Sequence, residues 1–390
     1  GGSTVTIAQR MFEGMNSFAL LAIPLYTFAG FTMSKGGISK RLMDFCYSIV
    51  GHIYGGLAHV NVLSSMIFAG ISGSAVADTA GVSGMFMPEM IRKGYSKNFT
   101  VAVTAISSTI GIIIPPSIPM VVIAGICGIS TGKLFLGGII PGILCGLAQM
   151  IVSYFMAKKE GVPKEPGHFT IGPVLHGLWE SWPALLMPII IVGTITMGIV
   201  SPTEAGVIAV VYGLFAGGII YRELKWEDIK FAFAETVRTS GRIFIVIGAA
   251  KLYTVMLTTA GFDKWVAKTM LGFSTNPTVI LIMILLIFFI VTMFMESIAT
   301  LTLFMPILYP IALGVGINPI VLSVLITVVI GIGLVTPPVG MCIYVACDLM
   351  DTTVGEVFPT LVPFIAATFV CIALMVAFPQ LILLPTYLMA

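Results

Sequence analysis

Gly111-Ile-Ile-Ile-Pro115-Pro116-Ser117 and Gly333-Leu-Val-Thr336-Pro337-Pro338-Val339 are the two stretches that decide the fold of this chain. Each carries a proline pair inside an apolar run, and the second pair lies 222 positions after the first. Two consecutive prolines remove two backbone donors and bar the preceding residue from helical geometry. Each stretch therefore predicts a membrane helix that is broken in mid-span.

The two breaks belong to a longer internal repeat. Pro141 and Pro363 recur at the same offset as the proline pairs, and Gly37-Ile-Ser-Lys40 is similar to Gly261-Phe-Asp-Lys264. Backbone carbonyls freed at membrane depth are tolerated only where protein or a water-filled cavity surrounds them. Broken helices at matching positions of two related halves are the best sequence indication of a transporter's binding site. The repeat therefore predicts that the protein moves a solute.

The composition indicates an all-helical, polytopic protein embedded in a lipid bilayer. Of its 390 residues, 58% are hydrophobic and 9% are charged, whereas a soluble protein carries about 25% charged residues. No HExxH, GxSxG or phosphate-binding loop motif occurs and no nucleotide-binding domain is evident, so we expect neither an enzyme nor an ATP-driven pump. The remaining energy source is an ion gradient, and nothing indicates a nucleic-acid partner. The cysteines are expected to be buried small hydrophobes, and they are Cys46, Cys127, Cys145, Cys342, Cys347 and Cys371.

Apolar segments divide the chain into membrane spans. Segments of spanning length lie near 14–34, 98–127, 136–157, 183–200, 205–222, 242–260, 319–349 and 358–378. Two longer stretches, near 55–91 and 279–313, have a small or polar interruption at Ile71-Ser-Gly-Ser74 and at Met295-Glu296-Ser297. We interpret each as a re-entrant hairpin that enters and leaves on one side. The alternative is a pair of ordinary spans joined by a tight turn.

These elements predict an inverted repeat in four parts. The parts are a scaffold helix in 1–36, a first repeat in 37–157, a polar loop and scaffold helices in 158–241, and a second repeat in 242–390. The segments 38–52 and 262–272 are expected to lie along the membrane surface, and 158–180 is expected to be a loop. Lysine and arginine fall mainly on one side, including Arg238 and Arg242 before the span at 242–260, and the positive-inside rule assigns that side to the cytoplasm. The first hairpin then lies at the cytoplasmic face and the second at the outer face.

Half-helix ends predict the residues of the site. Helix N-termini attract anions, and freed carbonyls and hydroxyls suit a hard monovalent cation. In the first half the candidates are the tip residues Ser72, Gly73 and Ser74, facing Gly111, Ile114, Pro116 and Ser117. In the second half they are Glu296, Ser297 and Thr300, facing Gly333, Thr336 and Val339. Small residues at such positions can also serve only to pack helices, but their occurrence in both halves favours ion sites.

Ionisable residues within spans are a second set of candidates, because burying a charge in a membrane is costly. Glu296 either contacts the solute or coupling ion, or is a hydrogen-bonded carboxylate of the tip. Asp78 either contacts the solute or stitches the first hairpin. Lys251 either attracts a carboxylate or sulfonate, or pairs with a neighbouring acid.

Several motifs resemble the large membrane subunit of tripartite ATP-independent periplasmic (TRAP) transporters. They are Phe18-Ala-Leu-Leu-Ala-Ile-Pro24, Gly70-Ile-Ser-Gly-Ser74-Ala-Val-Ala-Asp78, Pro88-Glu-Met and Gly111 through Pro119. The resemblance covers nearly the whole chain. It implies an elevator mechanism in the bacterial inner membrane, in which hairpins and broken helices carry the substrate past a scaffold. It also implies sodium-driven uptake, a periplasmic substrate-binding subunit and a small four-helix membrane subunit of the Q type. The implied substrate is a small organic anion such as a sialic acid, a C4-dicarboxylate or a sulfonate.

The resemblance also implies two sodium sites and a substrate site. The first sodium site would use Ser72, Gly73, Ser74, Gly111, Ile114 and Pro116, and the second would use Thr292, Glu296, Gly333, Thr336 and Val339. Substrate would contact Ser72, Ser117 and the tip acid, which is Glu296 here where the family more often has aspartate. Members usually have an extra N-terminal helix, which is missing ahead of Arg10. A stand-alone ion-coupled carrier or exchanger and a purely organising scaffold subunit remain alternatives.

Overall fold

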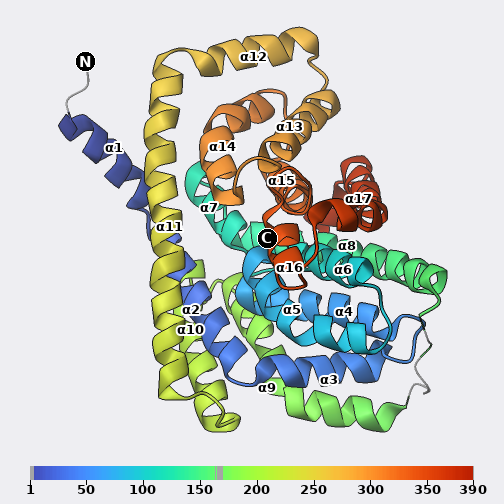
Figure 1. The fold of residues 1–390 in the computed structure, drawn as a ribbon. Helices are drawn as coiled ribbons and strands as arrows, with labels where there is room; N and C mark the ends of the chain where they lie inside the picture. Colours follow the sequence, from blue (N-terminus) through green and yellow to red (C-terminus); the bar gives the residue numbers. More distant parts are fainter. Residues whose placement is uncertain (1–3, 163, 165–169, 390) are drawn as a thin grey trace.

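The computed structural model describes residues 4–162, 164 and 170–389, and every regular element in that part of the chain is a helix. Seven of the described helices are long and apolar enough to cross a membrane. Figure 1 shows the longest, α11 (Trp226–Thr259), along one edge of the molecule, with the other helices beside it. The prediction of an all-helical polytopic membrane protein is confirmed.

The first half of the chain contains the predicted hairpin and broken helix. After α1 (Thr4–Met15) and the 3-10 turn η1 (Phe18–Leu21), the elements are α2 (Ala22–Lys35), α3 (Ile38–Val50), the hairpin α4 (Gly56–Ser72) and α5 (Ala75–Arg92), the broken helix α6 (Lys97–Ser108), η2 (Thr109–Ile112) and α7 (Ile118–Cys127), and α8 (Thr131–Glu160). The residues between η2 and α7 contain the first proline pair, which has a cis peptide bond.

The second half repeats this order. Its elements are α11, α12 (Phe262–Phe273), the hairpin α13 (Pro277–Thr292) and α14 (Ser297–Gly314), the broken helix α15 (Pro319–Gly333) and α16 (Met341–Asp348), and α17 (Val354–Ala377), followed by α18 (Gln380–Leu383) and η4 (Leu384–Met389). The second proline pair also has a cis peptide bond. Two hairpins and two helices broken at proline pairs therefore occur in matching order, as the sequence predicts.

The segment between the halves differs from the prediction. α8 continues to Glu160 and ends at Gly161, whose positive φ of 68° suits glycine. α9 (Ile171–Thr196) begins well before the predicted span at 183, and α10 (Pro202–Phe215) and the π-helical turn η3 (Ala216–Ile220) complete the segment. The predicted loop at 158–180 is thus shorter, and its residues 163 and 165–169 lie outside the described part. Polar residues such as His176 and Glu180 lower the hydropathy of the first turns of α9 without breaking the helix.

α11 also begins earlier than the predicted span at 242–260. Its first half carries charges, but ion pairs one turn apart join Lys230 to Glu227 at 3.0 Å and Arg238 to Glu235 at 2.6 Å. Such pairs support a helix where hydropathy is low. Arg238 and Arg242 therefore lie on α11, and the predicted boundary at 241/242 falls inside this helix.

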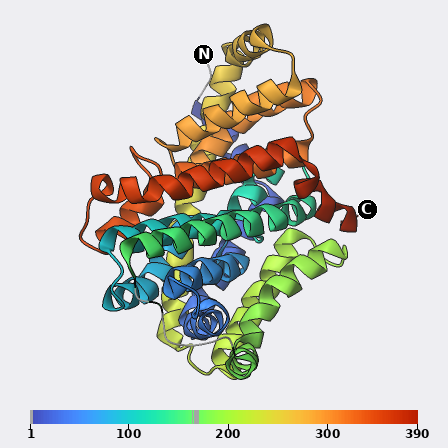
Figure 2. The ribbon, with the colours of Figure 1, turned by 90° about the vertical axis from the view of Figure 1, so that its right-hand side faces the viewer.

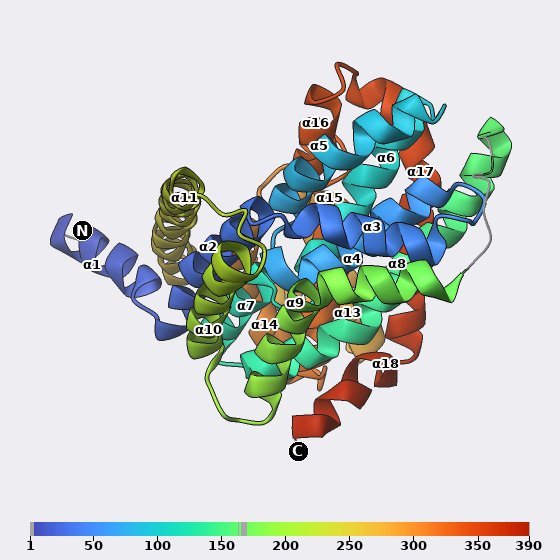
Figure 3. The same ribbon diagram turned by 90° about the horizontal axis from the view of Figure 1, so that it is seen from below.

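The helices form two groups, and each group contains helices from both halves of the chain. α2, α10 and α11 pack together, with aromatic contacts of Phe28 on Phe233 and Phe31 on Phe231, and Figure 3 shows them on one side. Figure 2 shows α8 and α17 side by side across the other part. We call α2, α9, α10 and α11 the scaffold group. α3 and α12 lead from this group to the two hairpins and are called the arms.

The two broken helices interlock at the centre of the molecule. α7 packs on α14 of the second hairpin, and α16 packs on α5 of the first. A Cβ atom on Gly331 of α15 would lie 3.3 Å from the Cβ of Thr109 in η2, so the two helices cross closely beside their breaks. The six cysteines are free thiols, five of them buried and Cys127 half-buried.

Candidate ion and solute site

The tip of the first hairpin touches the first break. α4 ends at Gly73, which reverses the chain with a φ of +66°, and Ser74 caps α5 by accepting a hydrogen bond from the Ala77 amide at 3.4 Å. The Gly73 carbonyl accepts a hydrogen bond from the Ile118 amide at 3.2 Å. A Cβ on Gly73 would lie 2.7 Å from the Pro116 carbonyl oxygen. The tip and the break are therefore in direct backbone contact.

Asp78 places a carboxylate in this contact. It is fully buried, and its Oδ1 accepts a hydrogen bond from the Ser72 hydroxyl. Its Oδ2 has no hydrogen-bond partner in the described part of the chain. A Cβ on Gly111 would lie 2.0 Å from that oxygen, so the carboxylate rests on the Gly111 backbone. A buried carboxylate oxygen without a partner is costly, and a bound cation is one kind of partner that could satisfy it.

Ser117 uses its hydroxyl within the break. Its Oγ donates to the Ile112 carbonyl at 2.5 Å and accepts from the Met120 amide at 3.3 Å, so it satisfies a freed carbonyl and caps α7. The side chain is fully buried. Ile114 lies in the same break, where its amide donates to the Ile110 carbonyl at 3.1 Å. In this conformation the Ser117 hydroxyl makes its hydrogen bonds to the protein's own backbone.

Glu296 precedes α14, the second helix of the other hairpin. Its Oε2 accepts hydrogen bonds from the Ile298 amide at 2.7 Å and the Ala299 amide at 3.2 Å, and the Ser297 hydroxyl donates to Oε1 at 2.5 Å. The Thr300 hydroxyl donates to the Glu296 carbonyl at 3.0 Å. Glu296 is half-buried and caps α14 at its N-terminus. The sequence allowed two roles for Glu296, contact with the solute or coupling ion and a hydrogen-bonded carboxylate of the tip. In this conformation Glu296 has the second arrangement.

The second tip and break meet as the first pair do. A Cβ on Gly333 would lie 2.6 Å from the Cβ of Thr292, and the Val339 amide donates to the Met293 carbonyl at 2.9 Å. The Thr336 hydroxyl donates to the Ile332 carbonyl at 2.7 Å. Gly333 thus occupies the position that Gly111 has in the first half, and both glycines let a hairpin tip approach a broken helix.

A freed carbonyl is also satisfied at the same repeat position in each half. The Ile112 carbonyl accepts a hydrogen bond from the Ser117 hydroxyl. The Leu334 carbonyl, 222 positions later, accepts one from the Cys342 amide at 2.9 Å. The Cys342 thiol lies close to Thr79 and Asp78 of the first hairpin. Nothing in the sequence marks Cys342, because its contact with the first hairpin arises from the packing of α16 on α5, and a residue after a proline pair carries no local sign of that packing.

The two halves differ in exposure. Ser72, Asp78 and Ser117 are buried, whereas Val339 in the second break is 40% exposed and Phe294 at the second tip is 60% exposed. Parts of the second tip and break therefore reach the molecular surface, whereas at the first pair Ser74 and Ile114 are half-buried and the other site residues are buried.

Lys251 is not among the residues that meet at the tips. It is exposed on α11, and its Cβ would lie 2.7 Å from a Cβ on Gly14 of α1. No hydrogen bond or ion pair of Lys251 is found in the described part of the chain. Among those residues there is also no cluster of three or more histidine, cysteine or acidic side chains that could hold a metal ion. The oxygen atoms at the tips and breaks are therefore the candidate ligands.

Replacing Ser72 with alanine is expected to reduce cation binding at the first tip. The change removes the hydroxyl that donates to Asp78 and leaves a second carboxylate oxygen unpartnered in a buried position. The change also removes a hydroxyl oxygen that is a candidate sodium ligand, and loss of a polar contact worth about 1–3 kcal/mol predicts roughly tenfold weaker sodium binding, measured by calorimetry on the purified protein. Ser83→Ala on α5, the other helix of the same hairpin, is the control, since Ser83 is buried but its hydroxyl has no hydrogen-bond partner in the described part of the chain. Equal sodium affinity in both variants would contradict the role of Ser72.

The chain is similar in sequence to one family of membrane transport proteins. Residues 2–381 match the family model described as the tripartite ATP-independent periplasmic transporter, DctM component. The chain is 37% identical over 360 residues to the isethionate TRAP transporter permease protein DctMQ of Oleidesulfovibrio alaskensis, covering 92% of this chain and 57% of that protein. It is 36% identical to the sialic acid TRAP transporter large permease protein SiaM of Vibrio cholerae, covering 97% of this chain and 88% of that protein.

Two further comparisons agree with this. The chain is 34% identical to the C4-dicarboxylate TRAP transporter large permease protein DctM of Pseudomonas aeruginosa, covering 99% of this chain and 90% of that protein. Among solved structures, the YdaH transporter of Alcanivorax borkumensis superimposes with a TM-score of 0.62 at 13% identity, over 94% of this chain and 86% of that one. At this low identity the likeness shows a shared fold only.

Proposed function

Because the chain belongs to the DctM family of tripartite ATP-independent periplasmic transporters, we propose that it imports a small organic anion together with sodium across the bacterial inner membrane. A periplasmic binding subunit would deliver the anion, and a small four-helix membrane subunit would complete the complex. The observation that carries the proposal is the contact of each hairpin tip with a broken helix, made through Gly111 in one half and Gly333 in the other.

The oxygen atoms at the first tip support a sodium site there. The Ser72 hydroxyl, the unpartnered Oδ2 of Asp78 and the backbone beside Gly111 lie together in a buried position. Hydroxyl, carbonyl and carboxylate oxygens at unwound helix segments are what transporters use to coordinate sodium. Bound sodium would supply the positive charge that this buried carboxylate lacks. Ser74, Gly73, Ile114 and Pro116 would contribute backbone or hydroxyl oxygens around it.

A second sodium site and the anion site are proposed near Glu296. The segment from Thr292 to Glu296 faces Gly333, Thr336 and Val339, which supply hydroxyl and carbonyl oxygens. The N-terminus of α14 also favours an anion, and in this conformation its Ile298 and Ala299 amides donate to Glu296, which would have to release them to a solute. The greater exposure of this half gives solute a way in. Ser72 and Ser117 would be reached only after the molecule changes conformation, since both are buried here.

The relatives' names limit the solute to a class. They refer to isethionate, sialic acid, C4-dicarboxylate and 2,3-diketo-L-gulonate, all of them small organic anions. We therefore propose the class and no single member of it. The hairpins and broken helices would move as a unit past the scaffold group, as in an elevator, with α3 and α12 connecting the two.

Transport should require all three components and rise with more than the first power of sodium concentration. Two cation sites bound together make the dependence sigmoidal, whereas one site gives a hyperbola. The test is uptake of a radiolabelled anion into proteoliposomes that hold this chain with its membrane partner, with binding protein and sodium added in turn. Uptake without either partner would favour the stand-alone carrier, and no uptake under any condition would favour the scaffold subunit. A hyperbolic curve with one bound sodium would refute the second site.

A further inference from the structure

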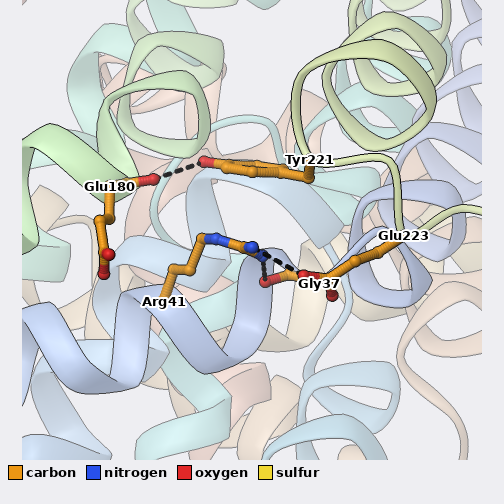
Figure 4. Close-up of polar contacts among 5 residues, drawn as sticks. All are labelled: Gly37, Arg41, Glu180, Tyr221 and Glu223. Carbon is orange, nitrogen blue, oxygen red and sulfur yellow. Dashed lines mark hydrogen bonds and ion pairs between the residues drawn. The ribbon is translucent and has the colours of Figure 1, made fainter.

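Arg41 ties the first arm to the scaffold group. Its Nη2 donates to Glu223 Oε1 at 2.6 Å and its Nη1 donates to the Gly37 carbonyl at 2.8 Å. Its guanidinium lies 4.2 Å from the ring centroid of Tyr221, a distance at which a cation is attracted to an aromatic face. The Tyr221 hydroxyl donates to the Glu180 carbonyl on α9 at 3.0 Å. Figure 4 shows these five residues joining α3 to α9 and to the segment after α10.

Backbone contacts hold the same end of the arm. A Cβ on Gly36 would lie 2.9 Å from the Cα of Gly217 in η3, so the start of the arm touches the end of α10. A Cβ on Gly37, which has a φ of +79°, would lie 1.9 Å from Glu223. On the other side of the arm the Ser181 hydroxyl donates to the Arg41 carbonyl at 2.9 Å. Burial raises the pKa of Tyr221 to about 12, so its hydroxyl remains a donor at neutral pH.

The hairpin end of α3 is built differently. It is followed by Gly51-His-Ile-Tyr-Gly55-Gly56, with three glycines in six residues. Gly55 has a φ of +75° and lies directly before α4. Glycine has the widest conformational freedom of any residue. In this arm the scaffold end is held by the polar contacts of Arg41. The hairpin end is a glycine-rich turn packed on α8, where a Cβ on Gly55 would lie 2.5 Å from the Cβ of Ala157.

The second arm has the reverse arrangement. α12 starts after Gly261, which has a φ of +77° and no atom within 4 Å of the position of a Cβ. The residue matching Arg41 in the repeat is Trp265, which is 62% exposed and stacks only on Phe262 of its own helix. At the hairpin end, Asn276 caps α13 by accepting from the Thr278 amide at 2.9 Å, next to Pro277. Here the scaffold end is open and the hairpin end is capped.

We propose that Arg41 is a positioning residue for transport: it pins the scaffold end of α3, so the first arm bends at Gly51–Gly56 and the second arm bends at Gly261. This rests on the proposed elevator motion. Arg41 touches neither solute nor ion and acts through the arm. An exposed ion pair alone contributes little, but Arg41 is 26% exposed and combines an ion pair, a cation–π contact and a bond to the arm's own backbone.

Arg41→Ala in the reconstituted complex should lower the maximal uptake rate about tenfold, with half-saturating sodium and anion concentrations changed less than twofold. The substitution removes the contacts that hold α3 to the scaffold group, so it slows the proposed elevator motion and leaves the ion and solute sites unchanged. The charge-swapped double variant R41E/E223R should recover part of the rate, and Arg41→Lys should recover less, because lysine lacks the planar fork. The control is Arg92→Ala, which removes a 2.6 Å ion pair to Glu89 on α5. Wild-type rates in Arg41→Ala, or equal losses in both alanine variants, would overturn the proposal.

Hydrogen exchange tests the same proposal without transport. In Arg41→Ala, exchange of the amides in 36–44 should rise at least tenfold, while exchange at the hairpin tips stays at its wild-type rate. In the wild-type complex, amides at 51–56 and around 261 should exchange faster than those at 36–44. Unchanged exchange at 36–44 in the variant would overturn the proposed role of Arg41 even if uptake is reduced. Absence of sodium-driven uptake in the wild type would instead refute the proposed function and leave this measurement to decide the pin.

Discussion

Glu296→Ala is expected to abolish sodium-driven uptake, to a rate about 100-fold or more below wild type. The variant removes the half-buried carboxylate at the second tip and leaves the α14 N-terminus, Thr292 and the second break without an acid. A 100-fold loss corresponds to about 2.7 kcal/mol. Loss of a helix cap costs only about 1 kcal/mol, so the fold should persist. The measurement is anion uptake into proteoliposomes, with folding checked by thermal unfolding of the purified variant.

Asn318→Ala is the matched control for this variant. Asn318 caps α15 in the same way, accepting from the Ile320 amide at 2.9 Å and the Val321 amide at 3.3 Å, but it is exposed and lies at the far end of the broken helix. Both variants lose a cap, and only Glu296→Ala loses an acid at the tip. Similar modest losses in the two would mean that Glu296 serves the helix alone. Glu296→Asp should retain measurable uptake, since aspartate is also a good cap and keeps the charge.

The fold could be predicted from sequence because its main determinants are local. Two consecutive prolines interrupt a helix whatever surrounds them, and Gly73 or Glu296 marks a hairpin tip within a few residues. The internal repeat then supplied independent support, since each half predicts the order of elements in the other. Membership of the DctM family confirms the resemblance that the motifs suggested, and its members are permease components, so the prediction that the chain is no enzyme is also confirmed.

The parts that the sequence missed depend on contacts between distant segments. α11 extends to Trp226 because ion pairs along its surface and aromatic packing on α2 compensate for low hydropathy, and a hydropathy window detects neither. Arg41 meets Glu223 across 182 positions of sequence, with no local signal in either residue. The tip residues were found because half-helix ends identify them. Lys251 was chosen for its place within a span, but the span's orientation places it beside α1 and not beside the tips.

Gly111→Ala is the second change expected to have a large effect, because it places a methyl group where the first tip meets the break. The new Cβ would lie 2.0 Å from Asp78 Oδ2 and 3.6 Å from the Ser74 carbonyl carbon. The carboxylate is fully buried and its other oxygen is held by Ser72, so moving it aside would break that hydrogen bond. Forcing extra volume into a packed interior typically costs about 1–3 kcal/mol. We expect sodium binding to weaken at least tenfold and uptake to fall by about 50-fold, measured by calorimetry and proteoliposome flux.

Gly333→Ala should behave in the same way, since its Cβ would lie 2.6 Å from the Cβ of Thr292 in the second half. Gly84→Ala on α5 is the control: a Cβ there would meet nothing within 4 Å, and alanine favours the helix. If tip–break contact creates the two cation sites, either site variant alone should reduce the steepness of the sodium curve, and the Gly84 variant should leave it unchanged. Full transport by both Gly111→Ala and Gly333→Ala would mean that the hairpins need no close approach to the broken helices, and the proposed sites would then have to lie elsewhere.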